Sequence, residues 1–163
     1  MTGNEKGVYF AKGNARPDTH AKVSGISGRV FSGLGRGAFF ISMEGYITQI
    51  DRMFGFKPFP GTLNLKIERD WDALVKGKWD GEETLHPVVH EKKTYGSARA
   101  IPASLQVGER SGEGGRDIID VVLLVLPKTA HSNTVEVIAP VNLRQSMGLV
   151  DGTLLEILPG KQN

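Results

Sequence analysis

The pattern of apolar and polar positions predicts a chain built mainly from short strands. Residues 62–67 and 134–140 alternate between polar and apolar side chains, which is typical of strands with one buried face. Residues 118–126, "IIDVVLLVL", are mostly apolar and far too short to cross a bilayer, so they predict a buried strand. Shorter strands are predicted around residues 27–32 and after the Asp-Gly turn at 151–152.

Helical spacing is limited to a few short segments. Apolar residues recur every three or four positions over 43–54, which predicts an amphipathic helix that ends at Gly55. Residues 70–77 and 141–149 predict a short helical turn and a short helix. Because most elements are strands, the order predicts a mainly β fold, and the repeated strand-helix units of a parallel nucleotide-binding sheet are missing.

Two regions are less regular. Residues 97–107 predict a strand that Pro102 interrupts at an edge or a bulge, while residues 79–89 have no clear period. Residues 1–23 are rich in Gly, Asn, Lys and Pro, the composition of a flexible N-terminal extension. We therefore place one β-barrel domain at residues 24–163.

Composition narrows the function classes only slightly. The 163 residues are 39% hydrophobic and 23% charged, as in an ordinary soluble domain, and a net charge of +2 is too small to indicate nucleic acid. The absence of cysteine excludes disulfides, thiolate metal sites and a cysteine nucleophile. The N-terminus lacks the apolar stretch of a signal peptide, so we expect a cytoplasmic protein that does not enter membranes.

The most distinctive stretch is "VFSGLGRGAFF" at residues 30–40, with Gly33, Gly35 and Gly37 at every second position. It matches neither the P-loop nor the dinucleotide-binding pattern. Glycines expose backbone N–H groups that can surround an anion, and Arg36 adds a positive charge. The glycines alone favour the alternative, a plain turn between two strands.

Two polar pairs add candidate chemistry. On a strand, Thr62 and Asn64 point to the same face, and their neutral oxygens suit Mg²⁺ if nucleotide phosphates supply the charge. The alternative is an ordinary polar outer face. Glu136 lies between apolar neighbours, where it is either a hydrogen-bond acceptor at the rim of a pocket or an outward-facing strand residue.

Four stretches in order resemble one family: "GRVFSGLGRGAFF", "GFKPFPGTLNLKI", "LPKTAHSNTVEVIAPVNLR" and "DGTLLEI". They are similar to the archaeal CTP-dependent riboflavin kinases over about residues 28–159. The resemblance implies a compact six-stranded cradle-loop β-barrel with one or two peripheral helices. It also implies transfer of the CTP γ-phosphate to the riboflavin 5′-hydroxyl, which gives FMN and CDP with Mg²⁺ as cofactor. We separately expect a monomer.

The same resemblance implies the site residues. Thr62 and Asn64 would ligate Mg²⁺, while Thr129 and Glu136 would contact the flavin. Two segments would bind the nucleotide: Leu34, Gly35, Arg36, Gly37, Ala38 and Phe39, then Val141, Asn142, Leu143 and Arg144. A flavin hydrogen bond and a general-base role are equally consistent with Glu136, so no catalytic base is assigned.

Two other functions stay open from the sequence. Small β-barrels of related topology bind DNA as regulators, and the basic N-terminal extension would suit that role, with a steep dependence of binding on salt. The Thr62 and Asn64 pair beside a glycine loop is not required for DNA binding and argues against it. The second alternative is a non-catalytic module that binds flavin or nucleotide.

Overall fold

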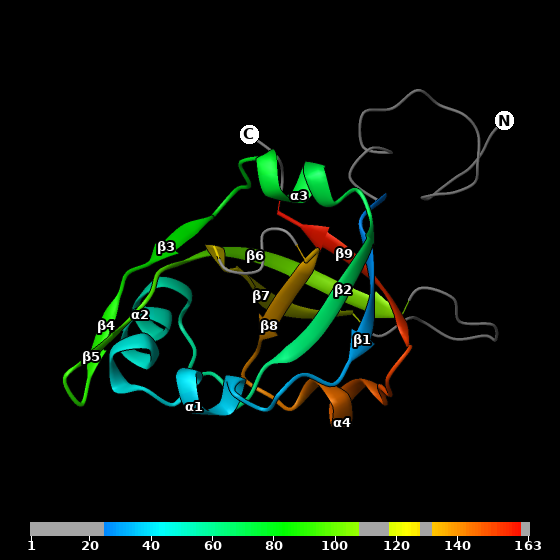
Figure 1. Ribbon diagram of the computed structural model, residues 1–163. Coiled ribbons are helices and arrows are strands. Elements are labelled where there is room, and N and C mark those ends of the chain that lie inside the picture. Colours follow the sequence, from blue (N-terminus) through cyan, green and yellow to red (C-terminus); the bar gives the residue numbers. More distant parts are fainter. Residues whose placement is uncertain (1–24, 108–117, 128–131, 161–163) are drawn as a thin grey trace, which may run out of the picture.

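The computed structural model describes residues 25–107, 118–127 and 132–160, and these contain nine strands and four helices (Figure 1). The strands are β1 (Ser27–Phe31), β2 (Leu63–Arg69), β3 (Glu83–Leu85), β4 (Val88–His90), β5 (Lys93–Tyr95), β6 (Ala98–Val107), β7 (Ile118–Val125), β8 (Thr134–Ile138) and β9 (Leu154–Pro159). The helices are α1 (Gly37–Ile41), α2 (Glu44–Phe54), α3 (Trp71–Lys76) and α4 (Leu143–Met147).

Six strands form a closed antiparallel barrel. They follow the order β6-β7-β8-β2-β1-β9, and β9 pairs again with β6, so the sheet has no open edge within this ring. The short strand β3 continues the sheet beside β6, and β4 and β5 form a separate hairpin. The prediction of a mainly β, six-stranded barrel is confirmed.

Strand alternation sorts the side chains into two apolar clusters. Leu65, Val135 and Ile157 belong to the cluster that fills the barrel. Ile138 belongs to a second cluster outside the barrel, where Ile50 of the amphipathic helix α2 also packs. Residues that alternate with the interior positions of β2 and β8 therefore face outward, away from the interior of the barrel.

Helices cover the barrel at both ends. Figure 1 shows α3 at one end, and α1 and α4 at the other. Leu74 of α3 and Leu143 of α4 are both buried in the interior cluster, so each helix closes one end of the barrel. Four helices are present, where the resemblance implied one or two. The short segments predicted at 70–77 and 141–149 are observed as α3 and α4, and only the five-residue α1 was not predicted, because it is too short to give a periodic apolar signal.

The predicted helix at 43–54 is observed as α2, and Gly55 ends it in the left-handed conformation, with φ 81°. Residues 79–89, which have no sequence period, contain β3 and the beginning of β4. These strands have three residues each, too few to establish an alternation. No helix in the described part of the chain is long and apolar enough to span a membrane.

Pro102 does not interrupt β6, contrary to the sequence prediction. It pairs with Val122 of β7 inside an unbroken ten-residue strand. On the other side of β6 the partner strand changes, from β3 up to Ala100 to β9 from Ala103 onward. Pro102 lies at this change of partner, so neither β3 nor β9 loses a strand-to-strand hydrogen bond because of its missing N–H. Its carbonyl accepts a hydrogen bond from the Gly160 N–H at 3.0 Å.

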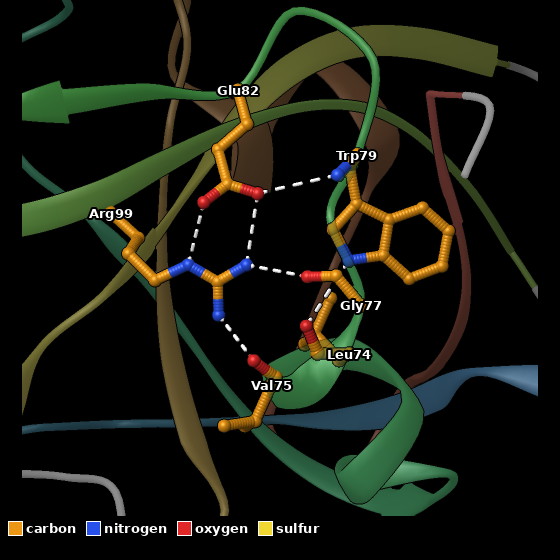
Figure 2. A network of polar contacts seen from close by, with 6 residues as sticks. All are labelled: Leu74, Val75, Gly77, Trp79, Glu82 and Arg99. Atoms are coloured by element: carbon orange, nitrogen blue, oxygen red, sulfur yellow. Dashed lines mark hydrogen bonds and ion pairs between the residues drawn. The ribbon is translucent and has the colours of Figure 1, made fainter. Parts of the chain in front are cut away.

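A polar network fastens α3 to the barrel (Figure 2). The Arg99 guanidinium of β6 forms two hydrogen bonds with the Glu82 carboxylate, at 2.7 and 2.8 Å. It also donates to the carbonyls of Val75 and Gly77 at the end of α3. This pairing is the main reason that the pKa of Glu82 lies below its usual value. The network holds the connection between β2 and β3 against β6.

Candidate nucleotide and metal site

The glycine loop lies against the start of β2. A Cβ added to Gly37 would stand 2.1 Å from Thr62 Oγ1, and one added to Gly33 would stand 2.6 Å from Asn64 Nδ2. Both approaches are possible only because glycine has no side chain. Gly35 between them has φ +79°, a conformation that favours glycine. The alternating glycines therefore bring the loop backbone against the two predicted metal ligands.

Glu136 lies directly beside this contact. On neighbouring strands, its Cα is the partner of the Asn64 Cα, and both residues face outward. The Thr62 side chain forms a hydrogen bond with the Glu136 carboxyl, which lowers the pKa of that carboxyl. Burial has the larger and opposite effect, so the pKa of Glu136 is raised overall. Three predicted site residues are thus gathered at one place on the outer face of β2 and β8.

The donor set fits a hard cation that also binds phosphate. Thr62 supplies a hydroxyl oxygen and Asn64 an amide oxygen, the neutral oxygen ligands that Mg²⁺ accepts. Within the described residues, no group of three or more His, Cys, Asp or Glu side chains gathers to hold a metal. Mg²⁺ held by these two side chains would therefore keep coordination positions for phosphate oxygens and water.

A pocket of about 160 Å³ connects Thr62 with the second predicted nucleotide segment. Residues from the loop before β2, from β2 and β8, and from the segment leading into α4 line it: Phe59, Gly61, Thr62, Leu63, Val137, Ala139, Val141, Asn142, Leu143 and Arg144. The pocket is smaller than the 300–1,000 Å³ typical of sites for drug-sized ligands. Its size suits one small ring beside the phosphate region.

The segment 141–144 contributes four residues to the lining of this pocket. The Asn142 side chain accepts a hydrogen bond from the Gln145 N–H at 3.2 Å and caps α4, so its carbonyl oxygen is already engaged. Leu143 is buried in the barrel core, while Val141 is exposed at the pocket. The Leu143 side chain is therefore part of the core, and only its main-chain atoms are available to a molecule in the pocket.

Arg144 is tied to two neighbouring segments. Its Nη2 donates to Asp151 Oδ1 at 2.7 Å and lies 3.4 Å from Ser32 Oγ, immediately before the glycine loop. Ser32 Oγ in turn donates to Asp151 Oδ2 at 2.8 Å. The Arg144 and Ser32 hydrogen bonds lower the pKa of Asp151. Part of the positive charge of Arg144 is therefore balanced, and its guanidinium is held beside the loop.

Comparison with known proteins gives the family. The model of the CTP-dependent riboflavin kinase domain, described as the domain of unknown function DUF120, matches residues 30–158. The chain belongs to this family. The riboflavin kinase of Pyrobaculum aerophilum is 37% identical over 136 residues, covering 81% of this chain and 59% of that protein. Those of Archaeoglobus fulgidus and Ignicoccus hospitalis are 34% and 33% identical, covering 81% and 85% of this chain and 53% and 72% of theirs.

The chain spans about three fifths of the length of the Pyrobaculum relative that it matches. The matched range of the riboflavin kinase domain nevertheless includes the glycine loop, both metal candidates, Glu136 and the segment 141–144. The whole candidate site therefore lies within the family domain.

The remaining predicted residues are less closely gathered. Leu34 is 88% exposed at the tip of the glycine loop, and Phe39 is half exposed on α1, where its ring meets those of Phe40 and Tyr95. Arg36 and Ala38 are also exposed. Thr129, the second predicted flavin contact, lies outside the described residues.

A larger cavity, of about 590 Å³, lies elsewhere on the riboflavin kinase domain. It is lined by residues of β6, β7 and β9 and by Phe54 and Phe56 near the end of α2. Its polar side chains include Ser104 and Asp120, whose hydroxyl and carboxylate form a 3.0 Å hydrogen bond with each other. The glycine loop, the metal candidates and Glu136 are not among its lining residues, so we do not place the candidate site there.

Sequence reasoning missed three residues of the site. Phe59 lines the pocket, and Ser32 and Asp151 hold Arg144. The two prolines around Phe59 were the available signal for a rigid connection at that point. No local pattern signals the approach of Ser32 to Asp151, which are 119 positions apart.

Proposed function

We propose that this protein is a CTP-dependent riboflavin kinase that transfers the CTP γ-phosphate to the riboflavin 5′-hydroxyl and forms FMN and CDP. The proposal rests on one observation above all. The glycine loop packs directly on Thr62 and Asn64, the predicted metal ligands, at one end of the small pocket that the segment 141–144 also lines. The name of the family supports a CTP-dependent reaction, and the relatives are riboflavin kinases.

The proposed phosphate site combines backbone and side-chain groups. Phosphoryl transfer requires in-line positioning and neutralisation of charge more than covalent chemistry by the protein. The loop around Gly35 presents accessible backbone to the nucleotide phosphates, while Thr62 and Asn64 would hold Mg²⁺. When bound, Mg²⁺ supplies the charge neutralisation that these uncharged ligands lack.

Glu136 is the proposed contact for the acceptor. It is half-buried beside Thr62, so its carboxyl can bind a polar group of riboflavin where water is partly excluded. The carboxyl accepts hydrogen bonds when ionised and can donate one when protonated. Because burial raises the pKa of Glu136, the change between these two states occurs at a higher pH than in a solvated glutamate. Thr129 is the second proposed flavin contact.

We assign selection of the nucleotide's base to the small pocket that the segment 141–144 lines. The main-chain groups of residues 141–144 can match the polar edge of cytosine, and a wrong base would leave them unpaired.

The test is a comparison of phosphate donors. Purified protein is incubated with Mg²⁺, riboflavin and either CTP or ATP, and the flavins are separated chromatographically. We expect FMN to form from CTP far faster than from ATP. Absence of FMN with both nucleotides would refute the kinase proposal, and binding of either substrate without turnover would indicate a non-catalytic module instead.

The metal assignment has its own test. Asn64→Ala should lower activity at limiting Mg²⁺ by more than about tenfold, the scale seen when even an outer partner of a metal site is lost. The affinity for Mn²⁺, measured by electron paramagnetic resonance with CDP present, should fall in parallel, while the melting temperature should change little. Gln106→Ala is a matched control, since it removes an amide from β6 that pairs with Glu156 away from the pocket. Full activity of Asn64→Ala at limiting Mg²⁺ would exclude Asn64 as a ligand.

A further inference from the structure

The pocket beside Thr62 contains an aromatic side chain with no role in the site described so far. Phe59 is 38% exposed, and Val141, which lines the same pocket, is 41% exposed. Both are large apolar side chains, and partial exposure of such groups in a concave site is typical of a surface that a ligand covers. A ligand ring bound in the pocket would remove exposed apolar surface of these side chains from water.

The backbone holds Phe59 in place. Its N–H donates to the Ala139 carbonyl at 2.8 Å, which fastens the residue to the end of β8. Pro58 and Pro60 flank it, and a residue before proline is restricted to extended conformations. The loop at this point is therefore anchored before any ligand arrives, which lowers the entropy lost on binding.

The ring also lies close to the phosphate end of the pocket. A Cβ added to Gly61 would stand 3.6 Å from Cε2 of the Phe59 ring, an ordinary van der Waals distance. Gly61 is followed directly by Thr62, the metal candidate. The aromatic ring therefore lies close in the chain and in space to Thr62, which is proposed to hold Mg²⁺ beside the phosphates.

We infer that the Phe59 ring is the surface on which the nucleobase of the phosphate donor stacks. Its role is to strengthen nucleotide binding. The inference rests on the proposed function, since it requires the pocket to hold a nucleotide. The pocket that Phe59 lines is shared with Thr62 and with the segment 141–144, the proposed contacts of the nucleotide, whereas Glu136, the proposed flavin contact, is not among its lining residues. Arg144 and the main-chain groups of 141–144 line the same pocket and can contact the polar edge of the stacked base.

Calorimetric titration with CDP and Mg²⁺ tests the inference without turnover. Phe59→Leu keeps an apolar side chain but removes the aromatic face, and it should weaken CDP binding by roughly 5- to 150-fold, the range measured for loss of a base–aromatic stack. Phe59→Tyr should bind CDP nearly as the unaltered protein does. Phe56→Leu is the matched control, because the same change occurs three positions away on the lining of the other cavity, and CDP affinity should not change.

Two further measurements separate stacking from a structural effect. Pyrophosphate has the phosphates without a base, so Phe59→Leu should bind it as tightly as the unaltered protein. Protons of the cytosine ring should shift upfield in the NMR spectrum on binding to the unaltered protein and to Phe59→Tyr, because they lie over an aromatic face. The upfield shift should disappear in Phe59→Leu at saturating CDP.

The outcomes distinguish this inference from the function on which it rests. If the unaltered protein binds neither CDP nor CTP, the kinase proposal and the stacking role both fail. If it binds CDP and Phe59→Leu binds it equally well, only the stacking role is overturned. Equal loss of pyrophosphate and CDP affinity, or loss of riboflavin affinity with CDP affinity unchanged, would likewise overturn it.

Discussion

The contact between Gly37 and Thr62 allows a quantitative test of the glycine loop. Gly37 is the first residue of α1 and has no positive φ, so alanine fits its backbone. Without the contact, Gly37→Ala would stabilise the protein by about 0.4–1 kcal/mol, because alanine lowers the conformational entropy of the unfolded chain. The added Cβ would instead lie 2.1 Å from Thr62 Oγ1 and 3.0 Å from both Thr62 Cβ and Thr62 Cγ2, where 3.4 Å is an ordinary contact.

Rotation of the Thr62 side chain cannot relieve this overlap, because its Cβ is itself only 3.0 Å away and does not move with the rotamer. The loop must therefore shift by about an ångström, at a cost of roughly 1–3 kcal/mol for overpacking. For a chain of this size, that loss lowers the melting temperature by roughly 2–12 °C. A displacement of ~1 Å in a positioning element also lowers turnover by about a hundredfold.

Thermal unfolding followed by circular dichroism, together with the FMN assay, measures both effects. Gly35→Ala is the control, since its φ of +79° is strained for alanine but nothing lies within 4 Å of the added Cβ. Thr62→Ala removes Thr62 Oγ1, the atom closest to the added Cβ. Gly37→Ala should therefore cost less free energy of unfolding in the Thr62→Ala protein than in the unaltered one, by more than about 0.5 kcal/mol, whereas the cost of Gly35→Ala should be the same in both. A higher melting temperature for Gly37→Ala than for the unaltered protein would refute the packing argument.

Two further predictions concern charged groups. Arg99→Met should destabilise the protein by about 2–4 kcal/mol at pH 7, because it leaves the Glu82 carboxylate partly buried and unpaired. The folded-state pKa of Glu82 is lowered, so its pairing with Arg99 stabilises the protein above the unfolded-state pKa of Glu82 and is lost on acidification. The difference in melting temperature between the unaltered protein and Arg99→Met should therefore narrow by about pH 3. A difference that does not change with pH would contradict this. Glu136→Gln should reduce FMN formation yet stabilise the unliganded protein at pH 7 by about 1 kcal/mol, because a raised pKa means that folding opposes ionisation of Glu136. That gain should vanish below the usual pKa of a glutamate, and a less stable Glu136→Gln at pH 7 would contradict the effect of burial.

Local patterns determined much of the barrel. Alternation over 62–67 and 134–140 is reproduced by β2 and β8, and the helical period over 43–54 by α2. These segments are long enough for their buried faces to set a period. The three-residue strands β3 and β4 and the five-residue helix α1 are not, and their formation depends on neighbours distant in the chain.

Pro102 shows the limit of a local rule. The absence of an N–H correctly indicated a special position, but the sequence could not reveal that β6 changes partner from β3 to β9 at this point. Barrel closure determines that change, and closure is a property of six strands together. The strand therefore continues where a local interpretation expected a break.

For the candidate site, the sequence by itself determined which chemical groups are available: alternating glycines, a Thr62 and Asn64 pair on one strand face, and an isolated Glu136. Only the tertiary structure decided that they meet. Pairing of β2 with β8 places Asn64 opposite Glu136, and the loop after β1 packs on both metal candidates. Side-chain type and alternation are local properties, whereas proximity depends on strand register and barrel closure, which depend on packing of the whole core.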